Sequence, residues 1–347
     1  MKLTYSSMRT FLNCRKLFYY RYVRRLKPIE KAVYLDVGSC IHEFLAAHYG
    51  KEGDTQNLVE EYFISRLPEK KDELYEEKET EAVNNIETCK RIISRYINQY
   101  KQADEKLTFI AIEKEFHVTA EDIGLNIDTE IIIKVDAIIS KNGIRYLMEH
   151  KTAAGIDNNY KKKLTSDLQS MFYIICLNAL GYNVQGVCYN VISKKLPAKP
   201  ELMKNGKLST AKNRKPDLTE YVKAIEDNNL DPAEYEEYLE WLRCNQPDSF
   251  FREYIVYHEN QLESLRDDLG SIIFDMLKSE TEGENPDSNY FYKNTSNCIG
   301  FGTCPFFDAC IAPYPESVIE NFFTSKTSAH EELTSPPGGI SPPVTRR

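Results

Sequence analysis

The sequence predicts an α/β fold in which helices cover the faces of a sheet. Helical spacing of apolar residues dominates the first hundred of the 347 residues. Three consecutive segments, 109–119, 125–139 and 144–151, then alternate or are β-branched, as strands are. A helical pattern at 164–180 and an apolar strand at 184–192 follow. This order of elements is typical of a sheet with helices on its faces.

Composition and charge bound the class of protein. The chain is 41% hydrophobic and 28% charged, as globular proteins are. No apolar stretch approaches the roughly 18 residues that cross a membrane, and the N-terminus lacks the apolar segment of a secretory signal. The nine cysteines favour reduced thiols or metal ligands over a secreted disulfide scaffold, because their number is odd. We therefore expect a cytoplasmic protein without a membrane partner.

Helices occupy the first part of the chain. Residues 5–25 have amphipathic spacing, with Ser6 or Ser7 as a possible N-cap. A second helix is expected at 39–49. The charged stretch 55–103 predicts two further helices.

Two of the predicted strands form a hairpin that carries acidic residues. Alternate residues of the first strand form one uninterrupted apolar face: Ile131, Ile133, Val135, Ala137 and Ile139. Its other face holds Lys134 and Asp136 among apolar residues. On the next strand, Glu149 and Lys151 share one face, since side chains alternate along a strand.

The turn between these strands sets their register. Asn142-Gly143 is a strong signal for a two-residue hairpin turn, because both positions require positive φ. A tight turn here places Asp136 directly opposite Glu149 on the same face, with Cβ atoms about 4.5–5.5 Å apart. Lys134 would lie opposite Lys151.

The facing acids predict a metal site. Two carboxylates repel one another, and burial strengthens the repulsion. A divalent cation between Asp136 and Glu149 removes this conflict, and oxygen ligands suit Mg²⁺ or Mn²⁺. Lys151 would orient a water or stabilise charge on a phosphate. The alternative is an exposed hairpin of mixed charge.

The remaining elements follow in order. A loop rich in Lys and Pro at 194–216 leads to an acidic helical segment that ends near residue 246. A short strand at 251–257 and a helix at 259–279 come next. Residues 325–347 are rich in Ser, Thr, Pro and Gly, and we expect them to be disordered.

Basic residues gather in two segments, although the net charge is −9. Residues 15–31 hold seven Lys and Arg against one acid, and residues 194–215 hold eight against one. Because charges beyond about 8–10 Å are screened, a polyanion responds to such local charge. The candidates for DNA contact are Arg15, Lys16, Arg24, Arg25, Lys194 and Lys195. The alternative is two solvated basic faces.

Motifs along the chain give the sequence a family resemblance. Gly38-x3-His42 lies on the second helix, Asp136 and Glu149-x-Lys151 lie on the hairpin, and Gln169-x3-Tyr173 lies on the following helix. This order resembles the PD-(D/E)xK nuclease superfamily, and the first and last motifs resemble those of its RecB-type members. Val135 stands in place of the Pro that gives the superfamily its name.

The resemblance implies a restriction-endonuclease-like core, with a central mixed sheet flanked by helices and with helical insertions. It implies a single nuclease domain over 1–324. Within that domain we expect a core over about 30–193, a helical and basic insertion over about 194–280, and a cysteine segment at 290–315.

The resemblance also implies roles for individual residues. The implied ligands of Mg²⁺ or Mn²⁺ are His42, Asp136, Glu149 and the backbone carbonyl of His150. The other implied catalytic residues are Lys151, which would position the attacking water, and Gln169 and Tyr173, which would contact DNA or Lys151. Glu113 or Glu115 on the preceding strand is an additional acid. The alternative for His42 is an ordinary core residue.

Three cysteines cluster near the C-terminal end. Cys298, Cys304 and Cys310 have the spacing C-x5-C-x5-C, and Cys14 is the candidate for the fourth ligand that a tetrahedral or cubane site needs. One N-terminal and three C-terminal cysteines hold a 4Fe–4S cluster in a subset of RecB-type nucleases, including the AddB nuclease domain and CRISPR-associated members. The arrangement here resembles theirs, although their usual spacing is C-x2-C-x5-C. Zn²⁺ is the alternative occupant.

The sequence thus predicts a metal-dependent DNA nuclease, an exonuclease of recombination, repair or phage DNA processing. One alternative is a non-catalytic DNA-binding or assembly subunit that retains the fold. Another is a CRISPR adaptation nuclease that trims prespacers. The chain has no GxxxxGK[ST] motif, so a helicase or recombination protein would be a separate partner.

Overall fold

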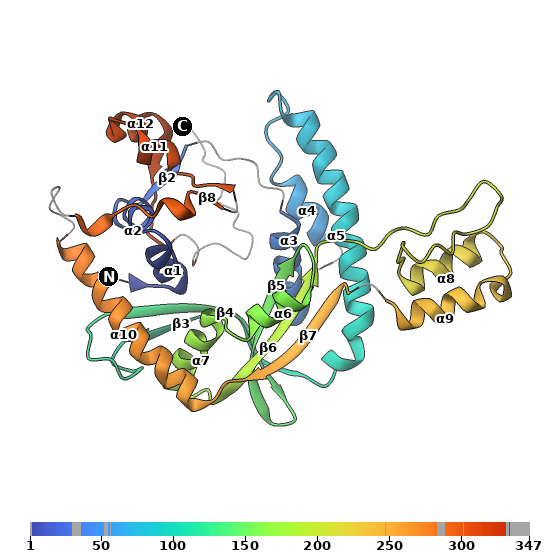
Figure 1. Ribbon diagram of the computed structural model, residues 1–347, viewed down its shortest axis with the longest axis horizontal. Coiled ribbons are helices and arrows are strands. Elements are labelled where there is room, and N and C mark those ends of the chain that lie inside the picture. Colours follow the sequence, from blue (N-terminus) through green and yellow to red (C-terminus); the bar gives the residue numbers. More distant parts are fainter. Residues whose placement is uncertain are drawn as a thin grey trace.

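A mixed sheet forms the centre of the molecule (Figure 1). The structure is a computed structural model that describes residues 2–29, 36–51, 55, 57–246, 248–282, 289–300, 302–330 and 333. The strands of the sheet in this part of the chain are β1 (Lys2–Leu3), β3 (Thr108–Thr119), β4 (Glu130–Lys141), β5 (Ile144–Ala153), β6 (Val184–Ser193) and β7 (Phe250–Val256). β3, β4 and β5 form an antiparallel meander, whereas β5 and β6 are parallel and β6 and β7 are antiparallel.

Helices cover both faces of this sheet (Figure 1). On one face lie α1 (Tyr5–Asn13), α7 (Leu168–Ala179) and α10 (Glu259–Glu282), and on the other lie α3 (Val37–Gly50), α4 (Leu58–Ile64) and α5 (Tyr75–Asp104). The first set packs Phe11, Phe172 and Ile273 against Ile133 of the sheet. The predicted α/β class, with a mixed sheet flanked by helices, is confirmed.

The other elements connect or extend these layers. They are α2 (Arg15–Phe18), a π-helix (Tyr19–Val23), β2 (Leu26–Pro28), α6 (Asn158–Leu164), α8 (Leu218–Asp227), a 3₁₀-helix (Pro232–Tyr235), α9 (Glu236–Cys244), two 3₁₀-helices (Asn289–Phe291 and Thr295–Asn297), β8 (Ile299–Gly300), β9 (Gly302–Thr303), α11 (Phe307–Ile311), α12 (Pro315–Phe322) and β10 (Phe323–Ser325). None of the helices in the described ranges is both long and apolar enough to cross a lipid bilayer.

The first predicted helix, 5–25, is divided in the structure. α1 ends at Asn13, and Cys14 is extended, with φ −163° and ψ 112°. The side-chain amides of Asn294 and Asn297 donate to the carbonyl of Asn13 at 2.9 and 2.7 Å. These two donors replace the helical N–H groups that would continue the helix. The helix therefore ends where the C-terminal segment contacts it, and no local pattern encodes that contact.

β4 begins at Glu130, five residues after the expected start of the strand at 125. The chain before it is a turn, in which Leu125 N–H donates to the carbonyl of Ala120. Leu125 and Ile127 pack against the core, and Leu125 lies close to Gly270 of α10. Their alternating apolar pattern reflects this packing rather than strand pairing.

α8 and α9 form a unit that projects from the body beyond α5 (Figure 1). The unit has a small core of its own, which includes Tyr221, Tyr238 and Leu242. β7 belongs to the central sheet and α10 packs on its face, although both were expected within the insertion at 194–280. The insertion is shorter than predicted because the chain returns to the sheet at β7.

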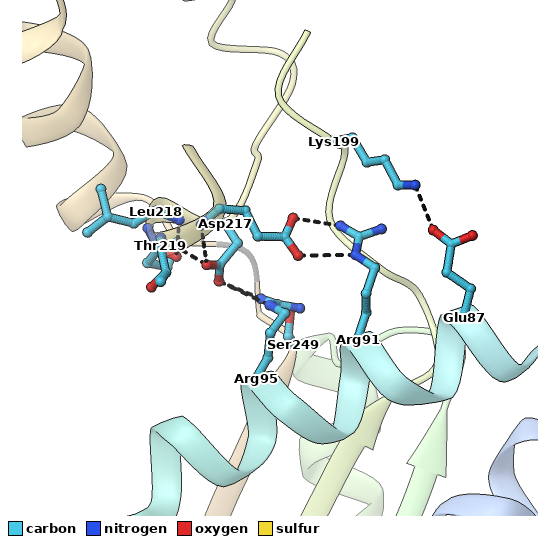
Figure 2. Close-up of polar contacts among 10 residues, drawn as sticks. Glu87, Arg91, Arg95, Lys199, Asp217, Leu218, Thr219 and Ser249 are labelled. Carbon is cyan, nitrogen blue, oxygen red and sulfur yellow. Dashed lines mark hydrogen bonds and ion pairs between the residues drawn. The ribbon is translucent and has the colours of Figure 1, made fainter. Parts of the chain in front are cut away.

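Ion pairs attach this projecting unit to α5. Arg91 pairs with Glu220 at 2.6 Å, and Arg95 pairs with Asp217 at 2.8 Å. Figure 2 shows Arg91 and Arg95 on α5, with Asp217 facing them. Lys199, in the loop that leads to the unit, lies 2.7 Å from Glu87 of the same helix.

The N-terminal elements meet β10, the last strand that the structure describes, beside α1. β10 pairs antiparallel with β2, so that Phe323 is opposite Pro28 and Ser325 is opposite Leu26. α11 and α12 lie next to α2 and β2 (Figure 1). The expected disordered tail, 325–347, lies mostly outside the described residues, although 325–330 are described and His330 Nε2 lies 2.8 Å from the carbonyl of Lys2.

Candidate active site

The site lies where β4 and β5 separate. The two strands pair from Lys141 opposite Ile144 to Ala137 opposite Met148, which is the register that the Asn-Gly turn predicts. One residue further along β4, Asp136 Oδ2 instead accepts a hydrogen bond of 2.7 Å from the backbone N–H of His150. The expected direct pairing of Asp136 with Glu149 is therefore wrong, and a backbone contact takes its place.

The predicted pairing of Lys134 with Lys151 is also wrong. Beyond this point β4 pairs with β1 at Ile131, so β5 has moved away from β4. Lys134 Nζ lies 3.3 Å from Glu113 Oε2 on β3 and forms an ion pair with this acid. Divergence of the strands thus separates two cations that a regular ladder would place together.

β4 is irregular at Asp136. Val135 and Ile138 belong to one apolar cluster, whereas Ala137 and Ile139 belong to another. The side chains of β4 therefore switch from one face of the sheet to the other at Asp136. The prediction of one uninterrupted apolar face is wrong. Glu113, in the ladder position across from Asp136 on β3, has a left-handed φ of 47°. Such irregularities re-aim side chains, and this one frees Asp136 from the apolar layers.

Lys151 connects the acidic strand to α7. Its Nζ lies 2.8 Å from Glu149 Oε1, 3.0 Å from Gln169 Oε1 and 3.7 Å from Asp167 Oδ2. Asp167 is the N-cap of α7 and accepts the Gln169 N–H, so the same residue begins the helix and contacts Lys151. Sequence reasoning missed Asp167, although an Asp just before a helical pattern is a capping signal.

Burial sets the charge states of these groups. Burial raises the pKa of Asp136 to about 7, and the nearby Glu113 adds to this. Burial likewise raises the pKa of Glu149 to about 7, against the opposing effect of Lys151. Burial lowers the pKa of Lys151, but Glu149 and Asp167 outweigh it, so its pKa is raised overall. The site therefore combines a charged lysine with two carboxyls that ionise near neutral pH.

His42 approaches from α3, on the other side of the sheet. Its Nδ1 lies 4.0 Å from Asp136 Oδ1, and burial lowers its pKa, which favours the neutral ring. Gly38, one turn earlier, allows α3 to approach β5, because a Cβ there would lie 2.6 Å from Thr152 Oγ1. The Gly38-x3-His42 spacing thus combines a close approach of the helix with a side chain directed to the site.

Comparison with known protein families agrees with this geometry. A family model described as the PD-(D/E)XK nuclease superfamily matches residues 2–310. The chain belongs to the PD-(D/E)XK nuclease superfamily. No curated protein matches it. One solved structure, titled "Crystal structure of SSO0001", matches over 60% of this chain and 86% of its own, with 12% identity and a TM-score of 0.21.

Two further residues named for the nuclease site have distinct positions. Tyr173 is buried one turn after Gln169, and its ring lies 6.4 Å from that of Tyr5. Of the two acids considered on β3, Glu113 lies by Asp136, whereas Glu115 contacts His117 at 2.8 Å on an exposed part of the strand.

The donors at this candidate site suit a divalent cation in their chemistry. Asp136, Glu149 and His42 offer two carboxylates and a neutral imidazole, and hard cations such as Mg²⁺ and Mn²⁺ prefer oxygen ligands. Within the described ranges, no three His, Cys, Asp or Glu side chains meet closely enough to hold a metal ion. The carboxylate oxygens instead accept hydrogen bonds from Lys151 and from the His150 N–H.

The four cysteines singled out in the sequence line one cavity. Cys14, Cys298, Cys304 and Cys310 surround a space of about 240 Å³ between α2 and the C-terminal segment. The backbone N–H of Asn294 donates to Cys14 Sγ at 3.4 Å, so the N-terminal cysteine contacts the C-terminal segment directly. The structure thus brings together cysteines that are nearly 300 positions apart in the sequence.

The side chains proposed to contact DNA differ in whether they already interact with acids or aromatic rings of the protein. Arg15 lies 2.5 Å from Asp275, and Arg24 lies 2.7 Å from Glu316. Lys16 Nζ lies over the rings of Tyr19 and Tyr20 at 4.7 and 5.0 Å. These three residues therefore stabilise the ends of the chain, and we expect little phosphate contact from them.

The remaining candidates lie closer to solvent. Arg25 and Lys195 are exposed, and Lys194 lies 3.5 Å from Asp36 at the start of α3. In the basic loop, Lys207 and Lys212 lie 2.7 and 3.9 Å from acids of the projecting unit. The loop is therefore less electropositive than its sequence indicates, because the acidic helices that follow it neutralise part of its charge.

Proposed function

We propose that this chain is a RecB-type deoxyribonuclease that hydrolyses phosphodiester bonds with Mg²⁺ or Mn²⁺, acts from DNA ends, and serves recombination, repair or phage DNA processing. The observation that carries the proposal is the meeting of Asp136, Glu149, Lys151 and Gln169 where β4 and β5 separate. The RecB-type motifs around His42 and Gln169 support the subgroup. Unwinding of a duplex would need a helicase activity that these 347 residues do not carry, because they lack the GxxxxGK[ST] motif.

In this proposal the residues around the acids divide the work of hydrolysis. His42, Asp136, Glu149 and the His150 carbonyl would hold the cation. Bound there, the cation would lower the pKa of a water and neutralise charge on the phosphate. Lys151 stays protonated because its pKa is raised, so it would donate to the water or to a phosphate oxygen rather than accept a proton.

Gln169 and Asp167 would hold the Lys151 ammonium in place, since both lie within 4 Å of it. Water oxygen would bond to phosphorus and one P–O ester bond would break. A solvent water would protonate the leaving oxygen, which leaves a phosphate monoester and a hydroxyl. The proton released by the water would pass to a carboxylate or to solvent. Tyr173 would support Gln169 from the adjacent turn of the helix.

The proposal includes a 4Fe–4S cluster at the cysteine cavity. Four thiols line one space of about 240 Å³, and the resemblance to RecB-type nucleases that hold such a cluster favours iron over the alternative occupant, Zn²⁺. Such a cluster would join α2 to the C-terminal segment. Elemental analysis for iron and zinc, with the visible spectrum near ~400 nm, tests this part.

The test of nuclease activity uses anaerobically purified protein. Its substrates are end-labelled linear single-stranded and double-stranded DNA and a closed circle, each with Mg²⁺, Mn²⁺ or EDTA. We expect metal-dependent loss of the linear substrates, loss of cleavage in Glu149→Gln and Asp136→Asn, and DNA binding close to wild type in both. Glu115→Gln is the matched control, because this acid contacts His117 away from the site.

Cleavage by Glu149→Gln at the wild-type rate would contradict the assignment of the site. Cleavage of the circle as fast as of linear DNA would contradict the requirement for an end. DNA binding without any cleavage by metal-loaded protein would instead indicate a non-catalytic DNA-binding subunit.

A further inference from the structure

A buried polar network lies on the face of β5 opposite Glu149 and Lys151. The His150 ring, which points to that face, stacks on Tyr49 with ring centres 5.8 Å apart and planes 10° apart. It also meets the His42 ring edge to face at 6.1 Å. His150 is 4% exposed, so these contacts and its hydrogen bonds fix the ring.

The hydrogen bonds of the network have one consistent direction. Arg252 Nε lies 3.2 Å from Asn190 Oδ1, and a guanidinium can only donate, so this oxygen is the acceptor. Asn190 Nδ2 is then the donor to His150 Nδ1 at 2.8 Å and to the Tyr96 hydroxyl at 2.7 Å. The Arg252 contact therefore sets the orientation of the amide that holds His150.

The other end of the network is equally determined. Arg252 forms an ion pair with Asp104, whose side chain is 16% exposed, and also donates to Tyr96 at 2.7 Å. Tyr96, which already accepts two hydrogen bonds, donates to Tyr49 at 2.6 Å, and Tyr49 donates to Asp104 at 2.9 Å. The network thus closes on Asp104 and joins α3, α5, β5, β6 and β7.

Two site residues depend on this network through the chain. The backbone N–H of His150, whose ring the network holds, donates to Asp136 at 2.7 Å. Tyr49 lies two helical turns after His42 on α3, so anchoring Tyr49 also anchors the helix that carries His42. A buried ion pair by itself adds little to the stability of the fold, because the cost of removing both charges from water offsets their attraction.

We propose that Arg252, Asp104 and Asn190 are positioning residues for cleavage, which fix His150 and His42 and thereby the Asp136 carboxylate for metal binding. The inference rests on the proposed function for its effect on cleavage, and its effect on metal binding can be measured separately.

The test compares two double variants that each remove one buried ion pair of α5. Arg252→Met with Asp104→Asn removes the charges of the network and leaves no buried charge without a partner. Arg95→Met with Asp217→Asn is the matched control, since that pair has side chains 13% and 15% exposed and joins α5 to the projecting unit (Figure 2). The control keeps the start of α8 intact, because asparagine caps helices about as well as the aspartate that it replaces. Mn²⁺ binding is measured by electron paramagnetic resonance, and cleavage is measured in single turnover.

We expect the network variant to bind Mn²⁺ about tenfold more weakly and to cleave at least about tenfold more slowly at saturating DNA, as loss of supporting residues around metal ligands does. DNA affinity in EDTA should change less than about twofold, and the control variant should match wild type in all three measurements. Arg252→Lys keeps the charge but cannot bridge Asn190 and Tyr96, so its cleavage should slow by a similar factor. This variant replaces the double variant in the test if the double variant does not fold.

Wild-type Mn²⁺ affinity and cleavage in a folded Arg252→Lys or network variant would overturn the inference while leaving the nuclease proposal intact. Absence of cleavage by the wild type, with Mn²⁺ binding weakened in the network variant, would overturn the nuclease proposal and support the positioning role for metal binding alone. Equal weakening in the Arg95 control would show that the effect is general destabilisation, which also overturns the inference.

Discussion

The affinity for Mn²⁺ should depend steeply on pH below neutrality. Burial raises the pKa values of Asp136 and Glu149 to about 7, from the ordinary values of 3.8 and 4.5. The metal-free site therefore holds protons in weakly acidic solution, and a cation must displace them before it binds. Because the carboxyls lose these protons as pH rises, affinity should increase with pH and level off once both are ionised.

The size of the effect follows from the same values. At pH 6, a group with a pKa near 7 is roughly 90% protonated, so metal binding would release close to two protons, and affinity would rise up to ~100-fold per pH unit. The two carboxyls interact and titrate as a pair, so one proton and a ~10-fold rise per unit is the lower bound. Above about pH 8 the dependence should be weak, because little of either acid remains protonated.

Isothermal titration calorimetry in two buffers with different ionisation enthalpies counts the released protons at pH 5.5, 6.5 and 8. Glu149→Gln should release about one proton fewer than wild type at pH 5.5, since one titrating group is removed. A wild-type Mn²⁺ affinity that changes less than about threefold between pH 5.5 and 8 would refute the reasoning, because ordinary carboxyl pKa values give that result.

Two further predictions concern stability and assembly. Cys14→Ser should lower the yield of folded protein and its iron or zinc content, measured by elemental analysis, more than the cleavage rate per folded molecule; unchanged metal content would exclude Cys14 from the site. Gly186→Ala should destabilise the protein by about 1–3 kcal/mol in chemical denaturation, because a Cβ there would lie 2.2 Å from the Ile255 carbonyl oxygen. Gly155→Ala, with no atom within 4 Å of the added Cβ, is the control, and equal effects would contradict the close-approach argument.

Local patterns were sufficient to predict the hairpin, whereas the site motifs were recognised by their resemblance to a known family. The Asn142-Gly143 turn determines the pairing near it, and the structure has that register from Lys141 to Ala137. The helical spacing of Gln169 places it on α7, where it contacts Lys151. These features depend on residues close in sequence, or on one strand and the next.

The departures from prediction come from contacts between distant segments. β1, at the N-terminus, pairs with β4 at Glu130 and Ile131, beyond the point where the β4–β5 ladder ends. Acids that follow the basic loop neutralise part of its charge, as Glu234 does for Lys207, and Arg24 pairs with Glu316. Arg252 lies about a hundred residues from the Glu-x-Lys motif in the sequence, and no spacing signal connects it to His150.

The contact of residues 14–28 with residues 294–325 bears on the order in which the protein can fold during synthesis. Asn294 and Asn297 supply the donors that contact Cys14 and the end of α1, and Glu316 pairs with Arg24. At about 5–20 residues per second, a ribosome needs roughly 15–60 s to make the intervening chain. During that interval the sheet can pair, but the first helices lack the donors that end α1 and the thiols that complete the cavity. The N-terminal segment would therefore be the last part to mature, and a chain released early would expose it.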